Sequence, residues 1–245
     1  MDHFNYFGND WTSHVKTEII GIVLNIFLNK KILIYGLGKS GLASFNFLKN
    51  NSDISLYDDH QSKFESLKIK QRLINYKNIL KKNFDQIIIS PGIDINKCKL
   101  SNFLKKNHSK IYSDLDVFYS FFKNDCITIT GTNGKSTTCQ LMYEVLLKQK
   151  FDVRLVGNIG NPILSVKNVK KKTIFIIEAS SYQLEYSKIF KSKYAVILNL
   201  SPDHIERHKT LSRYVKAKFK LLKNQYKGNL AFVKKNDYLI NKQLK

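Results

Sequence analysis

The sequence predicts an α/β protein made of two consecutive parallel-sheet domains, a Rossmann-like one followed by a P-loop-type one. Short runs of β-branched residues alternate with amphipathic stretches along most of the 245-residue chain, which is typical of parallel sheets covered by helices. Two of these runs lead directly into glycine-rich loops, Gly36–Gly41 and Gly131–Gly134. We expect residues 31–122 to form the first domain and residues 123–245 the second, and we assign no role to residues 1–30.

The first domain opens with a strand, a glycine-rich turn and a helix. The strand pattern at residues 31–35 is followed by GLGKSG, and an amphipathic stretch continues to Lys49. Asp58 and Asp59 end the next strand about 20 residues on, the spacing at which a dinucleotide fold holds a ribose, although ordinary tight turns share it. Because a phosphate loop follows in the second domain, we favour a nucleotide-diphosphate substrate over NAD. Further strands are predicted at Asp53–Tyr57 and Gln86–Ile89.

The second domain repeats the alternation after a connecting helix at residues 114–122 and a polar joint at residues 123–125. The apolar periodicity predicts strands at Cys126–Thr130, Val153–Val156, Thr173–Ile177, Tyr194–Leu198 and Asn229–Val233. It predicts helices at Lys135–Gln149 and Thr210–Lys223, and a polar stretch follows the last strand.

Composition excludes several protein classes. With 43% hydrophobic and 24% charged residues, the chain has the composition of a core-forming globular protein rather than a disordered one. The net charge of +22 suggests a nucleic-acid partner, but only four of the 41 basic residues are arginine, the side chain best suited to phosphates and base edges. We interpret the charge as a lysine-rich solvated surface and expect no nucleic-acid partner.

Neither a disulfide nor a membrane span is expected. Cys98, Cys126 and Cys139 are far apart and form no CxxC motif, which is typical of a reducing cytoplasm. The apolar run at residues 19–28 is interrupted by polar and small residues, and it is shorter than the ~20 residues that a membrane helix needs. We therefore expect a cytoplasmic protein without a membrane partner.

The segment Thr130–Thr137 (TGTNGKST) lies between a predicted strand and a predicted helix. Its glycines allow backbone N–H groups to face an anion, and the helix N-terminus adds its dipole. Lys135 supplies a charge for terminal phosphates and Ser136 a hydroxyl for Mg²⁺. A complete Walker pattern has a glycine where this chain has Ile129, so we interpret the motif as a shortened phosphate loop.

Polar side chains follow two later strands of this domain. Glu178 ends an apolar strand, the usual place for an Mg²⁺ ligand beside a phosphate loop, although a helix cap fits the same position. His204 and His208 have the spacing of a zinc pair, but a preceding proline and the lack of a third ligand argue against zinc. We expect His204 to contact substrate or metal and His208 to lie on the surface. Lys218 carries no signal of its own on a lysine-rich helix.

Five motifs follow one another in the second half of the chain. They are GTNGKSTT, GNIG at Gly157–Gly160, EASSYQLE from Glu178, NLSPDHIERH from Asn199 and YVKAK at Tyr214–Lys218. In order and spacing they resemble the Mur ligase family, over a stretch from Lys31 to Val233. The GLGKSG opening, SPGI at Ser90–Ile93 and SSYQLE most resemble the members that add D-glutamate to UDP-N-acetylmuramoyl-L-alanine.

The resemblance implies a role for each matching residue. ATP phosphates would be bound by Gly131, Thr132, Asn133, Gly134, Lys135, Ser136 and Thr137. Mg²⁺ would be held by Ser136, Glu178 and Lys218, the last matching the lysine that this family carbamylates. The UDP-linked substrate would contact Lys39, Ser40, Asp59, Gly92, Asn158 and His204. The catalytic residues would be Lys135, His204 and Lys218.

The activity implied is that of a monomeric, ATP- and Mg²⁺-dependent ligase of peptidoglycan synthesis. The alanine carboxylate would attack the γ-phosphate of ATP to give an acyl phosphate and ADP, and the D-glutamate amine would then displace phosphate. The same resemblance implies that the chain ends inside the central domain and lacks the family's third domain, so that alone it would have little or no activity. Two alternatives stay open: another Mur-type amino-acid ligase, and an inactive fragment that binds a UDP-sugar or nucleotide.

Overall fold

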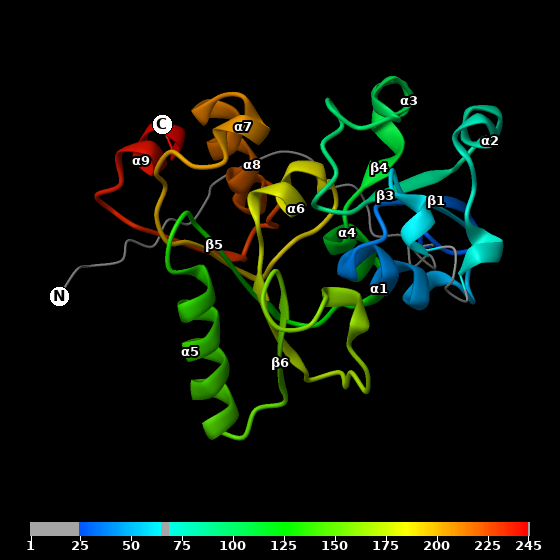
Figure 1. The fold of residues 1–245 in the computed structure, drawn as a ribbon. Coiled ribbons are helices and arrows are strands. Elements are labelled where there is room, and N and C mark those ends of the chain that lie inside the picture. The colour runs from blue at the N-terminus through cyan, green and yellow to red at the C-terminus, as the bar shows by residue number, and fades with distance from the viewer. Residues whose placement is uncertain (1–24, 65–68, 245) are drawn as a thin grey trace.

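Two parallel β-sheets form the framework of the protein in the computed structural model, which describes residues 25–64 and 69–244 (Figure 1). The first sheet has the order β2-β1-β3-β4. Its strands are β1 (Lys31–Tyr35), β2 (Asp53–Tyr57), β3 (Gln86–Ile89) and β4 (Ile111–Tyr112). The second sheet has the order β6-β7-β5-β8-β9. Its strands are β5 (Cys126–Thr130), β6 (Val153–Gly157), β7 (Ile174–Glu178), β8 (Tyr194–Ile197) and β9 (Leu230–Val233).

Helices connect the strands and confirm the predicted fold class. In the first half they are α1 (Lys39–Leu48), α2 (Tyr76–Lys81), α3 (Ser101–Lys106) and α4 (Asp114–Phe121). In the second half they are α5 (Lys135–Lys148), α6 (Ser181–Tyr186), α7 (Ile205–His208), α8 (Leu211–Lys223) and α9 (Tyr238–Leu244). Short 3₁₀ turns lie at Gln61–Phe64, Lys70–Arg72, His108–Lys110 and Ile163–Ser165.

The central strands are apolar along most of their length because both faces of a parallel sheet are covered. The residues from Ile32 to Tyr35 in β1 and from Phe175 to Ile177 in β7 have no exposed surface. Since every strand pair is parallel, the carboxyl ends of the strands in each sheet share one edge. The loops after those ends carry the candidate site residues, as expected of doubly wound α/β folds.

A buried carboxylate joins the two halves of the molecule. Asp116 lies on α4 and has no exposed surface. Its Oδ1 accepts hydrogen bonds from the Ser187 hydroxyl and from the three backbone N–H groups that follow Ser187, at 2.8–3.0 Å. Beside it the ring of Phe118 on α4 packs against Phe175 on β7, with the ring centroids 4.8 Å apart. Helix α4 therefore belongs to the core of both halves.

The structure differs from the sequence prediction mainly in short elements. The unpredicted α2, α3, α6, α7 and β4 are between two and six residues long, too short for a periodic pattern. Helix α9 replaces the polar stretch expected after β9. The unassigned extension falls largely on residues 1–24, outside the described residues. The domain boundary after residue 122 stays a prediction. Helix α4 ends just before it, and strand β5 begins just after it.

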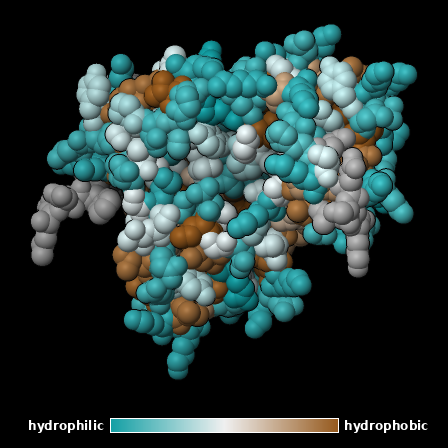
Figure 2. All heavy atoms as spheres, viewed as in Figure 1, coloured by the Kyte–Doolittle hydropathy of each residue, from teal (hydrophilic) through white to brown (hydrophobic). Residues whose placement is uncertain are grey.

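Most of the visible surface is hydrophilic, with apolar side chains gathered over α5 (Figure 2). The exposed apolar residues of this region are Leu141, Val145, Leu147 and Phe151. None of the helices that the structure describes is long and apolar enough to cross a bilayer.

We expect Asp116→Asn to lower the free energy of unfolding by about 2–4 kcal/mol, because one oxygen becomes an NH₂ group that accepts no hydrogen bond in a fully buried position. Urea unfolding followed by circular dichroism measures this. Asp85→Asn is the matched control: Asp85 is exposed and accepts one hydrogen bond, from the Lys31 N–H at 2.9 Å, so the expected loss is below about 1 kcal/mol. Equal losses in the two variants would contradict the joining role of Asp116.

Candidate active site

The phosphate loop turns at Gly134, directly before α5. Gly134 has a φ of +80°, a left-handed conformation that a Cβ disfavours. Asn199, which follows β8, braces the loop: its carbonyl accepts a hydrogen bond from the Thr132 N–H at 3.0 Å, and its side-chain oxygen accepts one from the Asn133 N–H at 2.9 Å. Sequence reasoning missed this contact of Asn199. The N-terminus of α5 is thus held at the carboxyl edge of the sheet, where it can receive an anion.

Lys135, the first residue of α5, folds back onto its own loop. Its Nζ donates a hydrogen bond to the Thr132 carbonyl at 2.8 Å. A phosphate at the loop would offer a charged acceptor in place of this neutral one, and charge-assisted hydrogen bonds are the stronger kind.

The carboxylate of Glu178 connects the phosphate loop to the loop after β6. Glu178 ends β7 and is 1% exposed. Its Oε2 accepts a hydrogen bond from the Ser136 hydroxyl at 2.8 Å, and its Oε1 accepts one from the Asn158 amide at 2.8 Å. The structure thus brings together three of the residues expected at the site, two for Mg²⁺ and one for substrate.

Lys218 is buried beneath the same loop. Helix α8 packs the apolar side chains of Tyr214 and Val215 inward, and Lys218, one turn further on the same face, is 2% exposed. Its Nζ donates to the Gly131 carbonyl at 2.7 Å and to the Thr130 hydroxyl at 3.3 Å. Burial, and secondly repulsion from Lys135, lowers the pKa of Lys218 to about 7. A large share of this amine is therefore uncharged at neutral pH.

His204 lies at the rim of this group. It precedes α7 with a φ of +53°, and its side chain is 42% exposed. Its Nε2 lies 3.3 Å from a carboxylate oxygen of Asp203, and its ring packs against Tyr182 and Tyr214, with centroids 4.9 and 6.3 Å away. The Tyr214 hydroxyl lies within hydrogen-bond distance of Thr132 in the phosphate loop. Tyr214 therefore lies between His204 and that loop.

The surface position expected for His208 is wrong. His208 is 3% exposed, and its Nε2 lies 3.0 Å from the Ser181 hydroxyl. Its ring stacks on Tyr182 with the centroids 5.6 Å apart. Burial, and secondly the charge of Arg207, lowers the pKa of His208 to about 4. The ring is held neutral in the core because α6, a helix too short to predict, covers it.

A cleft of about 580 Å³ lies between the two halves. The expected substrate residues that line it are Lys39, Ser40, Asp59, Gly92 and Asn158. His204, expected beside them, is not among its lining residues. The two halves together form this cleft, since Lys39 belongs to the first and Asn158 to the second.

Two acidic residues shape the end of the cleft beside the glycine-rich turn. Asp58 Oδ2 accepts a hydrogen bond from the Leu37 N–H at 2.8 Å, so this carboxylate fixes the glycine-rich turn. Asp59 Oδ1 accepts one from the Tyr35 hydroxyl at 2.7 Å. A second hollow of about 450 Å³ shares both carboxylates and adds Tyr57, Tyr76 and Lys99.

Gln183 also lines the cleft and was missed at the sequence level. Its Oε1 accepts a hydrogen bond from the Ser180 N–H at 3.2 Å, and its Nε2 donates to the buried Asp114 at 3.2 Å. Burial raises the pKa of Asp114 to about 6. The amide of Gln183 is thus oriented by hydrogen bonds from both its oxygen and its nitrogen. In the sequence, the serine and glutamine of the capping box at the start of α6 were the signal that could have pointed to this residue.

The donor set at the phosphate loop suits Mg²⁺. Ser136 and Glu178 offer hydroxyl and carboxylate oxygens, the hard ligands that this ion prefers, and the ion usually keeps several waters and phosphate oxygens besides. Within residues 25–64 and 69–244, no group of three or more His, Cys, Asp and Glu residues is arranged to hold a metal. A site with few protein ligands that is completed by phosphates is consistent with both observations.

Both halves of the chain match described domains. Residues 30–111 match the Mur ligase MurD-like N-terminal domain, and residues 129–245 match the Mur ligase middle domain. The UDP-N-acetylmuramoylalanine–D-glutamate ligase of Rickettsia felis is 35% identical over 219 residues, which is 88% of this chain and 48% of that protein. The ligase of the same name from Caldicellulosiruptor bescii is 38% identical over 206 residues, or 80% of this chain and 45% of that protein. The chain thus spans about half the length of these curated relatives.

A solved structure shares the fold. The UDP-N-acetylmuramate:L-alanyl-gamma-D-glutamyl-meso-diaminopimelate ligase of Neisseria meningitides aligns with a TM-score of 0.56 at 16% identity, over 88% of this chain and 74% of that chain. At this identity the likeness concerns the arrangement of sheets and helices alone.

We expect acid to destabilise the protein partly through His208. Its pKa is about 4 when folded and 6.5 in the reference state, so between these values the unfolded chain binds the extra proton and stability falls as the pH falls. Thermal melts from pH 7 to pH 4 should show a smaller loss of Tm in His208→Gln than in the unmodified chain. Parallel curves for the two proteins would contradict the buried neutral state.

Proposed function

Because this chain belongs to the Mur ligase family, we propose that it provides the substrate-binding and ATP-binding parts of a D-glutamate-adding ligase of peptidoglycan synthesis. The curated relatives carry that activity in their names. The observation that supports the proposal most is the junction at Glu178, where one carboxylate contacts the phosphate loop through Ser136 and the substrate cleft through Asn158. A phosphate donor and a substrate bound there would lie next to each other.

We assign the cleft to UDP-N-acetylmuramoyl-L-alanine. Its diphosphate fits the glycine-rich turn before α1, where Lys39 and Ser40 line the cleft and the helix N-terminus favours an anion. The muramoyl-alanine end then extends towards Asn158 in the second half. In this orientation the alanine carboxylate points at the phosphate loop.

We assign the phosphate loop to ATP. Lys135 would leave the Thr132 carbonyl to donate to the transferred phosphoryl group, whose growing negative charge its ammonium offsets. Ser136 and Glu178 would hold Mg²⁺, which offsets the charge on the phosphate oxygens when it is bound. His204, at the rim beside Asp203, would contact the muramoyl-alanine end or the metal.

The proposed reaction has two steps. The alanine carboxylate attacks the γ-phosphorus of ATP, the bond to ADP breaks, and an acyl phosphate forms. The amine of D-glutamate then attacks the acyl carbon, the C–N bond forms, and inorganic phosphate leaves with the bonding electron pair. These steps need electrostatic stabilisation and positioning rather than a side-chain nucleophile.

We place the reaction in the cytoplasm because the three cysteines are free thiols.

We expect two substitutions to separate the two ligands. Lys135→Ala should weaken Mg²⁺-ATP binding by about tenfold or more, since it removes a charged hydrogen bond, and leave UDP-N-acetylmuramoyl-L-alanine within about twofold. Lys39→Ala should weaken binding of UDP-N-acetylmuramoyl-L-alanine by about tenfold or more and leave the affinity for Mg²⁺-ATP within about twofold. Isothermal titration calorimetry measures both affinities, and loss of both ligands in either variant would contradict the assignment of separate subsites.

A turnover assay with the same chain distinguishes the alternatives. Release of ADP that requires both the UDP-linked substrate and D-glutamate supports ligation. Binding of both ligands without such release favours the non-catalytic fragment, and binding of neither contradicts the proposal.

We expect Lys218 to form a carbamate with CO₂, because an amine with a pKa of about 7 is about half uncharged at neutral pH, and the uncharged form is able to attack. The N–C bond forms as one proton leaves the nitrogen, and the product is an anionic oxygen ligand suited to Mg²⁺. In the presence of ¹³C-bicarbonate, a carbamate signal should appear by NMR, fade below about pH 7, and be absent from Lys218→Arg. Lys216→Arg, an exposed lysine of the same helix, should keep it, and a signal that survives in Lys218→Arg would contradict the assignment.

A further inference from the structure

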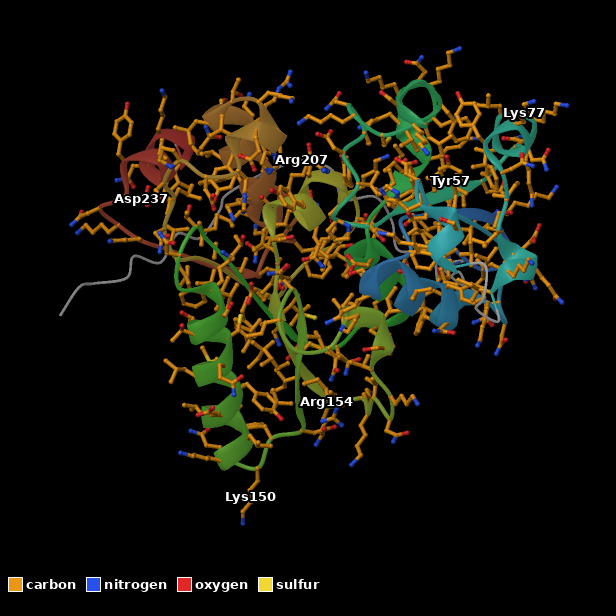
Figure 3. The ribbon with its side chains drawn as sticks, viewed as in Figure 1. Tyr57, Lys77, Lys150, Arg154, Arg207 and Asp237 are labelled. Atoms are coloured by element: carbon orange, nitrogen blue, oxygen red, sulfur yellow. The ribbon has the colours of Figure 1, made fainter. Side chains whose placement is uncertain are left out.

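Arg207 connects the segment that carries His204 to the nucleotide side of the cleft. It lies on α7, where α6 and α7 come together (Figure 3), and it is 9% exposed. Its Nη2 donates to the Ile93 carbonyl in the first half at 2.5 Å. The same nitrogen contacts the Tyr186 hydroxyl at 2.9 Å and the Glu185 carboxylate at 3.3 Å. One side chain of the second half thus holds a backbone carbonyl of the first.

The Ile93 carbonyl belongs to a turn that packs directly on the glycine-rich loop of the nucleotide site. The Ile93 N–H donates to the Ser90 carbonyl at 3.0 Å, and the Ser90 hydroxyl donates to the Gly36 carbonyl at 2.6 Å. A Cβ at Gly36, where φ is +91°, would lie 2.8 Å from the Ser90 Cβ and 2.9 Å from the Ile93 Cγ1. The turn at residues 90–93 and the glycine-rich loop are therefore packed directly against each other, and both line the cleft.

Arg207 is also hydrogen-bonded to the segment that carries His204. Its N–H donates to the His204 carbonyl at 3.1 Å within the single turn of α7. A helix of four residues has almost no stability of its own. The position of α7, and of His204 before it, therefore depends on contacts made by its side chains.

The surroundings of Arg207 indicate a connecting role. Its Nε has no hydrogen-bond partner in the described part of the chain, and an unpartnered buried donor is unfavourable. The charge is offset by Glu185 and by the faces of Tyr182 and Tyr186, whose ring centroids lie 5.1 and 5.7 Å from the guanidinium carbon. An apolar residue would satisfy this core better, but it would not hold the Ile93 carbonyl.

We propose that Arg207 is a positioning residue that fixes the turn at residues 90–93 relative to the segment of His204, so that one substrate can contact both halves at once. The inference rests on the proposed function, because it concerns the same cleft and its UDP-linked substrate. A ligand confined to the first half gains no affinity from this fixed relative position. A ligand that reaches both halves loses affinity when the relative position of the two segments is lost.

The test compares UDP with UDP-N-acetylmuramoyl-L-alanine on the full chain by isothermal titration calorimetry. The measured quantity is the ratio of their dissociation constants, which reports what the muramoyl-alanine end adds. In Arg207→Met the advantage of the longer ligand should fall about tenfold, the effect of a lost charged hydrogen bond, while UDP alone stays within about twofold. Arg213→Met, an exposed arginine on α8, is the matched control and should keep the ratio.

Two further variants keep the test decisive if Arg207→Met folds poorly. Tyr186→Phe removes the hydroxyl that accepts from Arg207 and from the Ile95 N–H at 3.4 Å and that donates to the Ile93 carbonyl at 3.5 Å. It should lower the ratio in the same direction. Arg207→Lys keeps the charge and should restore part of the ratio. An unchanged ratio in folded variants, an equal loss for both ligands, or a ratio near one in the unmodified chain overturns the positioning role. Binding of neither ligand by the unmodified chain instead contradicts the proposed function.

Discussion

The candidate active site depends on one buried carboxylate, that of Glu178. Parallel strands end at a common edge, and Glu178 is the last residue of β7 at that edge. Its two oxygens accept hydrogen bonds from Ser136 at the start of α5 and from Asn158 after β6. Two loops that are distant in the sequence are therefore fixed on one side chain. The phosphate loop and the cleft between the two halves are adjacent for this reason, as the proposed phosphoryl transfer requires.

The cleft also requires that the two halves keep a fixed relation. Buried contacts of different kinds provide it: the carboxylate of Asp116 on α4 holds the chain after α6, and Arg207 holds the turn at Ile93. Asp116 lies in the core and acts on the whole joint, whereas Arg207 acts at the rim of the cleft. The two contacts therefore act at different places along the joint between the halves.

Sequence patterns predicted the parts of this protein that depend on regular burial. The central strands were predicted to within one or two residues because both faces of the sheets are covered and the runs are apolar along most of their length. Lys218 carried no signal among so many lysines, and its burial one turn after Tyr214 on the apolar face of α8 was seen only in the structure. His208 was expected at the surface, since the short helix that covers it leaves no periodic pattern. Contacts between distant segments, such as those of Asn199, could not be predicted without the fold.

Whether the two proposed sites meet is tested most directly by a distance measurement between bound ATP and bound UDP-N-acetylmuramoyl-L-alanine. Mn²⁺ would replace Mg²⁺ on a non-hydrolysable ATP analogue, and proton relaxation of the alanine methyl group would be recorded on bound UDP-N-acetylmuramoyl-L-alanine. We expect strong paramagnetic relaxation of that methyl group, reversed by excess Mg²⁺ and lost in Glu178→Gln. Binding of both ligands without any relaxation of the methyl group would show that the two sites do not meet, and would contradict the joining role of Glu178.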